Sequence, residues 1–457
     1  MVDLQKMRDT EINWIGLIPA HWSLKKIKYV FWERKENNNP IQTENLISLT
    51  IEKGVIPHSE KTGGGNKPKE DLTKYKIVRP GDIVLNSMNV IAGAVGISKY
   101  FGIVSPVYYM LIPLDEGSTK EYFHHLFRTE LFQRSLYGLG NGILIKENEE
   151  TGKMNTIRMR IPMDKLGDQL IPVPPLSEQK LISHYLDKKT SKIDLLINKI
   201  EKKIELIKER RTSLINQCVT NGLNPNVEMK NSGVEWVADI PKHWNTYPIK
   251  RIFLEYFGGS WGDDPTESQK ENLVQVIRVT EFNMDLLTIS SDIPTIRSLN
   301  LSTDSKKLVK KNDLILEKSG GGEKTPVGRI VLVDRELNFP TINSNFTNIC
   351  RPNPEIVDPK FALFSLFAGY INGRTLRNIK QTTGIQNLDL DGFMSELISL
   401  PPLEEQREIA GFLDAENKVF LKRLDHLVRY IDLLKEYRQS IISSAVTGKI
   451  RISEETI

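Results

Sequence analysis

The chain has 457 residues, of which 39% are hydrophobic and 26% are charged, a composition typical of a soluble protein with two or more globular domains. No apolar run approaches the ~18 to 20 residues of a membrane span, and the first residues, MVDLQKMRDTEINW, lack the apolar core of a signal peptide. We therefore expect a cytoplasmic protein without a membrane partner.

Charge and cysteine content narrow the function only slightly. The formal net charge is +4, which permits a nucleic-acid partner without requiring one. Two cysteines, Cys218 and Cys350, form neither a disulfide framework nor a zinc set, so we interpret both as buried or half-buried thiols in a reducing compartment.

The chain contains an internal repeat with a period near 225 residues. We expect residues 1–12 to be flexible. A leader then follows, and its pattern returns 222 residues later. The matching residues are Trp14, Ile18, Pro19, His21, Trp22, Ile27, Lys28 and Phe31, then Trp236, Ile240, Pro241, His243, Trp244, Ile249, Lys250 and Phe253.

A globular part follows each leader. In the first, the pattern predicts strands at 44–51, 82–89 and 96–112, an exposed loop at 63–70, a helix at 119–137 and a closing segment at 154–161. In the second, residues 312–324 take the place of 82–89, a helix is predicted at 361–371, and 382–390 closes the part. Leaders and helices match between the copies, while the Gly- and Asn-rich loops do not. We therefore interpret the copies as sharing one structural frame and recognising different targets.

A long helix ends each repeat. Residues 176–220 and their counterparts 227 residues later carry the spacing of a coiled-coil seam. The seam residues are Ile193, Ile197, Ile200, Ile204, Ile207, Leu214 and Cys218, then Phe420, Leu424, Leu427, Ile431, Leu434, Ile441 and Ala445. Prolines precede both helices, Ser177 is the predicted N-cap of the first, and some 43 helical residues would span ~65 Å.

Pairing of two equivalent units about a two-fold axis predicts that the helices are antiparallel. One arginine interrupts each seam, Arg211 in the first and Arg438 in the second. These arginines could fix the register, bind an acidic group of a partner, or extend to the surface.

Catalytic motifs are missing from the sequence. The segment SGGGEKT, residues 319–325, lacks the spacing of a P-loop, and no dinucleotide fingerprint opens a helix. Glu228 and Lys230 have a nuclease-like spacing, but we interpret them as solvated linker charges. We interpret His21 and His243 as packed structural corners, because no metal-ligating partners stand near them.

The loops carry residue types suited to DNA. Asn86, Ser87 and Asn89 follow a predicted strand and could reach base edges. Around Gly320, Gly321 and Gly322, the residues Lys318, Lys324 and Arg329 supply charge where backbone could approach a phosphate, and Glu317 could accept from a cytosine amino group. Ordinary surface turns remain the alternative interpretation.

The chain resembles the specificity subunits of type I restriction-modification systems over nearly its whole length. The resemblance rests on the leaders IPAHW and IPKHW, the helix starts PPLSEQ and PPLEEQ, the seams with KERR and KEYR that end in VTNG and VTGK, and the blocks GDIVLNSMN, GIVSP and LILEKSGGGEKTPVGR. It implies an α/β (α+β) fold with two target-recognition domains, 1–172 and 223–399, a first spacer helix, 173–222, and a second spacer helix with a C-terminal tail, 400–457.

The resemblance also implies the partners. Each domain would read one half of a split target in double-stranded DNA, and the helices would set the spacing and dock two modification methyltransferase subunits. S-adenosylmethionine would sit on those partners, with no cofactor or catalytic residue on this chain. Whether a restriction nuclease-translocase subunit joins the complex stays open.

The two copies differ just before their helices, TIRMRI at 156–161 and GIQNLD at 384–389, so we expect an asymmetric two-part target. The first alternative is a coiled-coil scaffold without DNA specificity, whose binding would not depend on DNA sequence. The second, a free-standing methyltransferase or nuclease, would require activity from this chain alone.

Overall fold

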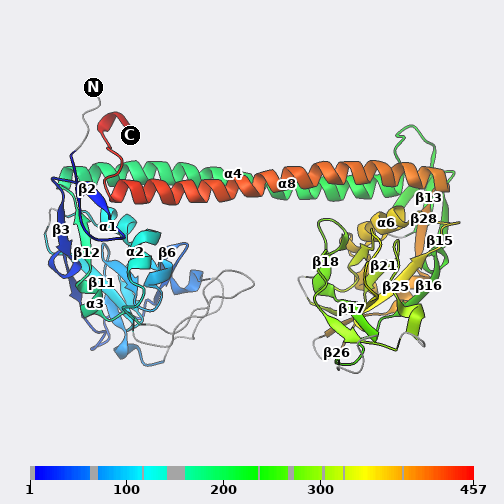
Figure 1. Cartoon of the computed structure of the whole chain (residues 1–457), viewed down its shortest axis with the longest axis horizontal. Coiled ribbons are helices and arrows are strands. Elements are labelled where there is room, and N and C mark those ends of the chain that lie inside the picture. The colour runs from blue at the N-terminus through cyan, green and yellow to red at the C-terminus, as the bar shows by residue number, and fades with distance from the viewer. Residues whose placement is uncertain are drawn as a thin grey trace. The chain divides into compact units, whose positions relative to one another are not determined.

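The computed structural model describes residues 6–61, 70–115, 118–140, 160–234, 237–265, 272–300, 304–322, 325–382 and 385–456. It divides into two compact units, and each takes one globular part and one half of each long helix (Figure 1). Unit 1 is Met1–Lys199 with Tyr430–Ile457, and unit 2 is Ile200–Arg429.

Unit 1 is built on a four-stranded antiparallel sheet in the order β4 (Phe31–Arg34), β11 (Tyr108–Pro113), β8 (Ile83–Asn86) and β9 (Val95–Ile97). Two-stranded sheets surround it: β1 (Met7–Asp9) with β2 (Leu17–Pro19), β3 (Ser23–Lys26) with β12 (Leu170–Val173), β5 (Ile47–Thr50) with β6 (Gly54–Pro57), and β7 (Lys76–Val78) with β10 (Gly102–Val104). Its short helices are α1 (Lys120–Phe127), α2 (Glu130–Ser135) and α3 (Met163–Gly167). Phe31 of the sheet packs edge-on against Phe123 of α1, with ring centroids 4.9 Å apart.

Two expectations for unit 1 were wrong. Residues 7–9 are part of a hairpin, β1 with β2, in which Arg8 donates to the carbonyl of Trp22 at 2.8 Å. The helix predicted over 119–137 is interrupted, because the Thr129 hydroxyl accepts from the Phe132 amide at 3.3 Å and starts a second helix there. The predicted loop at 63–70 and closing segment at 154–161 lie mostly outside the described residues.

Unit 2 repeats this plan with additions. Its main sheet has the order β16 (Phe253–Gly258), β25 (Thr347–Pro352), β21 (Leu314–Glu317), β23 (Ile330–Leu332), β19 (Thr288–Ile289) and β18 (Phe282–Asn283). Smaller sheets are β13 (Met229–Val234) with β14 (Val237–Pro241), β15 (Asn245–Pro248) with β28 (Leu397–Leu400), β20 (Ile296–Ser298) with β17 (Leu273–Ile277) and β24 (Thr341–Asn343), and β22 (Ser319–Gly321) with β27 (Ile385–Leu388) and β26 (Ile379–Thr382). The helices are α6 (Pro359–Ile371) and α7 (Leu390–Ser395).

The region interpreted as a solvated linker is structured. Lys230 lies in β13, and Glu228 pairs with Lys242 at 2.8 Å. The segment 319–325 opens no helix: Ser319–Gly321 form β22, which pairs with β27.

One turn shows how closely the two frames agree. Before β8 the Arg79 amide donates to the Asp82 carboxylate at 2.9 Å, and before β21 the Lys310 amide donates to that of Asp313 at 2.8 Å. The residue before each aspartate has a positive φ, 94° at Gly81 and 72° at Asn312, and these are residue types that tolerate this conformation. The turn is therefore built twice with different residues.

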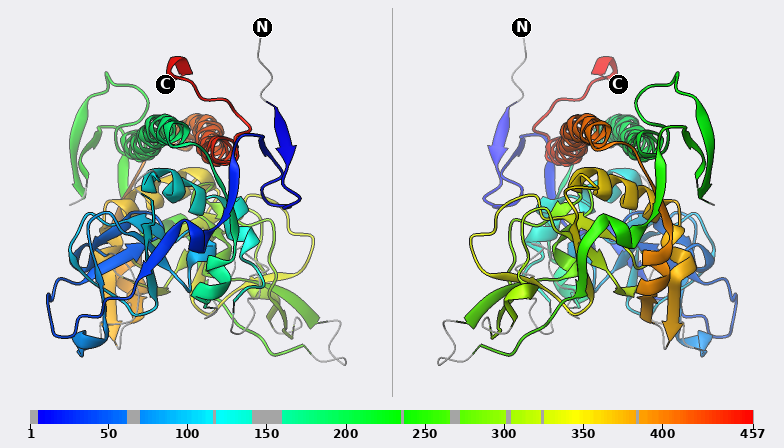
Figure 2. Two further views of the ribbon diagram at one scale, coloured as in Figure 1. Left: turned by 90° about the vertical axis from the view of Figure 1, so that its left-hand side faces the viewer. Right: turned by 90° about the vertical axis from the view of Figure 1, so that its right-hand side faces the viewer.

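The long helices are α4 (Leu176–Asn221) and α8 (Leu403–Val446), and they lie side by side in both views (Figures 1 and 2). In unit 1 the first half of α4 pairs with the last half of α8, because Asp194 binds Arg438. In unit 2 the last half of α4 pairs with the first half of α8, because Arg211 stacks on Phe420. The helices are antiparallel, as predicted. The N-cap assignment of Ser177 was wrong, because α4 begins one residue earlier.

Among the described residues, no helix is long and apolar enough to cross a membrane. Both cysteines are free and buried, as the sequence suggested. Burial raises the pKa of the Cys218 thiol to about 11 and also raises the pKa of Cys350.

Candidate nucleic-acid interface

A glutamate at the start of each long helix holds the leader of the same unit. In unit 1 the Glu178 carboxylate contacts Nε2 of His21 at 2.6 Å and accepts from Nε1 of Trp22 at 2.8 Å. In unit 2 Glu405 makes the same two contacts with His243 and Trp244, at 2.7 and 3.2 Å. We call each set of three residues a clasp. The repeated histidines thus take part in the attachment, as expected, but the prediction that they are packed was wrong, because both side chains are 46% exposed.

The glutamine after each glutamate joins the helix to the globular part. Gln179 is buried, donates to the carbonyl of Pro174 at 2.8 Å, and accepts from the amide of Thr119, which precedes α1, at 2.9 Å. Gln406 does the same with Pro401 at 3.0 Å and with Asp358, the N-cap of α6, at 2.9 Å. The repeated motif PPLxEQ therefore fixes each globular part to its own helix half.

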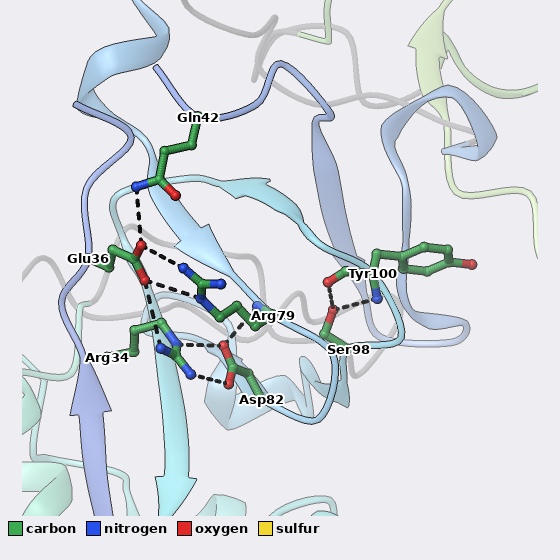
Figure 3. A network of polar contacts seen from close by, with 7 residues as sticks. All are labelled: Arg34, Glu36, Gln42, Arg79, Asp82, Ser98 and Tyr100. Carbon is green, nitrogen blue, oxygen red and sulfur yellow. Dashed lines mark hydrogen bonds and ion pairs between the residues drawn. The ribbon is translucent and has the colours of Figure 1, made fainter. Parts of the chain in front are cut away.

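Ion pairs fix the start of the central strand. In Figure 3, Asp82, which precedes β8, binds the guanidinium of Arg34 at 3.1 and 3.3 Å, and Glu36 binds Arg79 at 2.8 Å. The hydrogen bond from Arg79 lowers the pKa of the Glu36 carboxyl below its ordinary value, with smaller contributions from Gln42 and Arg34.

The equivalent aspartate of unit 2 is paired with an arginine that comes from a different strand of the sheet than in unit 1. Asp313 binds Arg351 of β25 at 2.9 and 3.0 Å, and Arg351 also reaches Glu255 at 3.0 Å. Because both aspartates are almost completely buried, each needs its arginine, and these residues maintain the frame.

The candidate DNA-binding residues lie at the other end of the same strands. In unit 1, Asn86 ends β8, and its side-chain oxygen accepts from the Met88 amide at 3.0 Å. The Ser87 hydroxyl is buried and donates to the Val107 carbonyl at 2.6 Å. Asn89 is half-buried and stands directly before a short helical turn. Asn86 and Ser87 thus use their polar groups to hold the loop.

In unit 2 the residues in these places are different. Glu317, at the end of β21, is 1% exposed and binds the guanidinium of Arg329 at 2.7 and 2.8 Å. This hydrogen bonding raises the pKa of Arg329 above its ordinary value. The two groups that the sequence suggested for DNA therefore face each other.

The neighbouring positions of unit 2 are more open. Lys318 is half-buried, Gly320 and Gly322 are exposed, and Gly321 is buried. Gly321 is required by close packing, since a Cβ there would lie 2.5 Å from the Val327 amide. Lys324 lies outside the described residues. The structure thus brings Lys318, Glu317 and Arg329 together around the end of β21.

The seam positions all turn inward or partly inward. Ile193, Ile197 and Ile431 are buried, and Ile204 and Leu424 are half-buried. Arg438 binds Asp194 at 2.9 Å, whereas Arg211 stacks 4.7 Å from the ring centroid of Phe420 and donates to the Asp285 carbonyl at 2.7 Å. The two equivalent arginines have different partners.

Sequence reasoning missed one neighbour of Lys318, the turn between β24 and β25. The Lys318 amide donates to the Phe346 carbonyl in this turn at 2.9 Å. Its only sequence signal is the polar run NSNFTN, which stands where the first copy has the apolar residues around Ser105.

Comparison with known proteins relates part of the chain to a described family. Residues 241–438 match the family described as "Type I restriction modification DNA specificity domain". The chain is 22% identical to a putative type I restriction enzyme MjaX specificity subunit of Methanocaldococcus jannaschii, over 96% of each protein. It is 24% identical to the EcoBI specificity subunit of Escherichia coli, over 62% of this chain and 59% of that one.

Solved structures share the fold. One, reported under complex assembly and conformational transition of the type I R-M system, superposes with a TM-score of 0.62 at 15% identity and covers 95% of this chain and 99% of the other. The HsdS subunit from Thermoanaerobacter tengcongensis gives 0.50 at 17% identity, with 95% and 98% covered. With a duplicated frame on paired long helices, the chain is similar to the specificity subunits of type I restriction-modification systems.

Proposed function

We propose that each unit carries one target-recognition domain and that the two domains read different halves of an asymmetric, two-part DNA sequence. The observation behind this proposal is the contrast between a duplicated frame and divergent loops. Clasps, turns and sheet order agree between the units, whereas Asn86 and Ser87 correspond to Glu317 and Lys318. Two units that share a sheet order but differ in the residues at the end of the central strand are suited to different targets.

In this proposal the chain contributes recognition and its partners contribute chemistry. Two modification methyltransferase subunits bring S-adenosylmethionine, and the chain itself is not catalytic. A restriction nuclease-translocase subunit can join the same assembly. Among the described residues, no group of three or more His, Cys, Asp or Glu side chains is placed to hold a metal ion.

Apolar side chains on the outer faces of the helices support the docking role. In unit 1, Leu195 of α4 and Leu433 and Tyr437 of α8 are 60%, 61% and 55% exposed. In unit 2, Leu206 of α4 is 55% exposed and Val428 of α8 is 45% exposed. Apolar side chains that lie outside the seam and face water are unfavourable in the free chain. They are suited to packing against a helix of a partner.

Co-expression with the neighbouring methyltransferase, followed by genome-wide sequencing of methylated bases, tests the proposal. We expect a motif of two unlike halves separated by unspecified bases, and no methylation from either protein alone. Binding of the assembled complex should weaken steeply with salt. A palindromic motif, or methylation by this chain by itself, contradicts the proposal; affinity that ignores DNA sequence favours the scaffold alternative.

A further inference from the structure

The turn at residues 343–348 of unit 2, between β24 and β25, presents two side chains to solvent. The amide of Thr347 donates to the Ser344 carbonyl at 3.0 Å and closes the turn. Asn345 and Phe346 stand at its tip, and the phenylalanine ring is 47% exposed. The tip of the turn therefore presents an amide and an aromatic ring to solvent side by side.

Unit 1 has the same turn with different side chains. There the Tyr108 amide donates to the Ser105 carbonyl at 3.0 Å. The sheet register aligns the two turns, because Tyr108 pairs with Asn86 and Thr347 with Glu317. Pro106 and Val107 of unit 1 thus correspond to Asn345 and Phe346 of unit 2. The backbone is kept while the tip changes from aliphatic to amide and aromatic.

Three buried polar atoms of the turn have no hydrogen-bond partner among the described residues. They are Oδ1 of Asn343, Oγ of Ser344 and Oδ1 of Asn348, in residues that are 0%, 1% and 2% exposed. A buried polar atom without a hydrogen-bond partner destabilises a folded protein. These three atoms lie in residues on either side of the exposed tip of the turn.

The turn is packed against a positive charge. Its Asn343 and Ser344 carbonyls lie 2.2 Å from where a Cβ of Gly259 would stand, so only glycine fits there. A Cβ on the adjacent Gly258 would lie 3.2 Å from Nζ of Lys318 and 3.9 Å from Oδ1 of Asn348. The Lys318 ammonium therefore sits beside the turn, next to backbone without side chains.

We propose that this turn reads the DNA half-site of unit 2, with Asn345 on a base edge, Phe346 against a thymine methyl group or a base face, and Lys318 on the adjoining phosphate. Amides pair with adenine edges, and aromatic side chains pack on thymine methyls or enter base steps. This inference rests on the proposed recognition function and assigns the base-reading residues of unit 2 to a segment outside the Gly-rich loop.

The test uses the assembled methyltransferase complex with Phe346→Val, which installs the residue of the equivalent turn, and with Asn345→Ala. Phe339→Val is the matched control, because Phe339 is also exposed, at 40%, and precedes β24 in the same unit. We expect both turn variants to alter the motif only in the half read by unit 2. The affinity ratio of cognate to random DNA should fall about tenfold, as loss of one base contact implies.

The outcomes separate the two proposals. If the wild-type complex methylates a two-part motif and both turn variants keep the same motif and the same affinity ratio, the turn does not read DNA. A uniform loss of affinity for cognate and random DNA leaves the ratio unchanged and also contradicts the assignment. If the wild-type complex itself shows no two-part motif, the proposed recognition function fails before the turn is tested.

Discussion

A single carboxylate joins the leader to the long helix in each unit. In unit 2 the Glu405 side chain is 26% exposed, while the indole that donates to it, Trp244, is fully buried. The carboxylate reaches inward from the helix start to satisfy the one polar atom of that ring. A buried indole N–H without an acceptor loses the free energy of its former hydration.

We therefore predict that Glu405→Ala lowers the stability of unit 2 by about 1 to 2 kcal/mol, because Trp244 Nε1 loses its acceptor. Glu405→Gln keeps an acceptor oxygen and should cost less. Thermal unfolding of the full-length chain, followed by tryptophan fluorescence, measures both. The control is Glu404→Ala, which removes an exposed carboxylate one position earlier; equal shifts for Glu404→Ala and Glu405→Ala contradict the clasp.

At the scale of elements, local signals located the long helices well. Heptad spacing and flanking prolines predicted a helix from residue 176, and α4 begins at Leu176. Both signals act within a few residues of the chain, so they can be read directly. The sequence does not reveal that Ser87 donates to Val107, since that contact depends on β8 and β11 being paired.

The candidate DNA residues show the same limit. Residue type singled out Glu317 and Arg329 for DNA, yet Glu317 at the end of β21 forms an ion pair with Arg329, which directly precedes the neighbouring strand β23. Conversely, Phe346 carries no DNA signal in the sequence and is exposed only because its turn projects beside Lys318. Whether a polar loop residue faces solvent or its own fold is decided by long-range strand pairing.

The two seam arginines should respond differently to truncation. Burial lowers the pKa of Arg211, whose guanidinium lies near the rings of Phe420 and Phe367. We predict that Arg211→Ala costs about 2 kcal/mol through lost packing and cation–π contact. Arg438→Ala should cost under about 1 kcal/mol, because Arg438 and Asp194 are 25% and 50% exposed.

Denaturant unfolding of the two variants, compared with wild type, measures this difference. A cost for Arg438→Ala as large as that for Arg211→Ala contradicts the prediction and indicates that the ion pair with Asp194 holds the helices together. The substitution Asp194→Asn then tests the ion pair with Arg438, because it removes the charge of the carboxylate and keeps the shape of the side chain.

At the scale of the whole molecule, the chain carries the same frame twice, which supports the proposal of two recognition surfaces on one chain. Each globular part is fixed to its own helix half by its clasp and by Gln179 or Gln406. The loops can therefore change without disturbing the helices. We therefore propose that helix length controls the spacing of the two half-sites.

Removal of one heptad from each helix tests this control. We choose Ile200–Leu206 in α4 and Leu427–Leu433 in α8, which correspond at the 227-residue offset and keep the seam in phase. Seven residues remove ~10.5 Å of helix, equivalent to about 3 base pairs of DNA. We expect the methylated motif to keep both half-sites with the spacing between them changed, or methylation to be lost although the complex still assembles.

Deletion of four residues from each helix, which breaks the heptad phase, is the control and should prevent normal helix pairing. An unchanged spacing in the heptad variant contradicts a measuring role, because helices that only brace the units can be shortened without moving the half-sites on DNA.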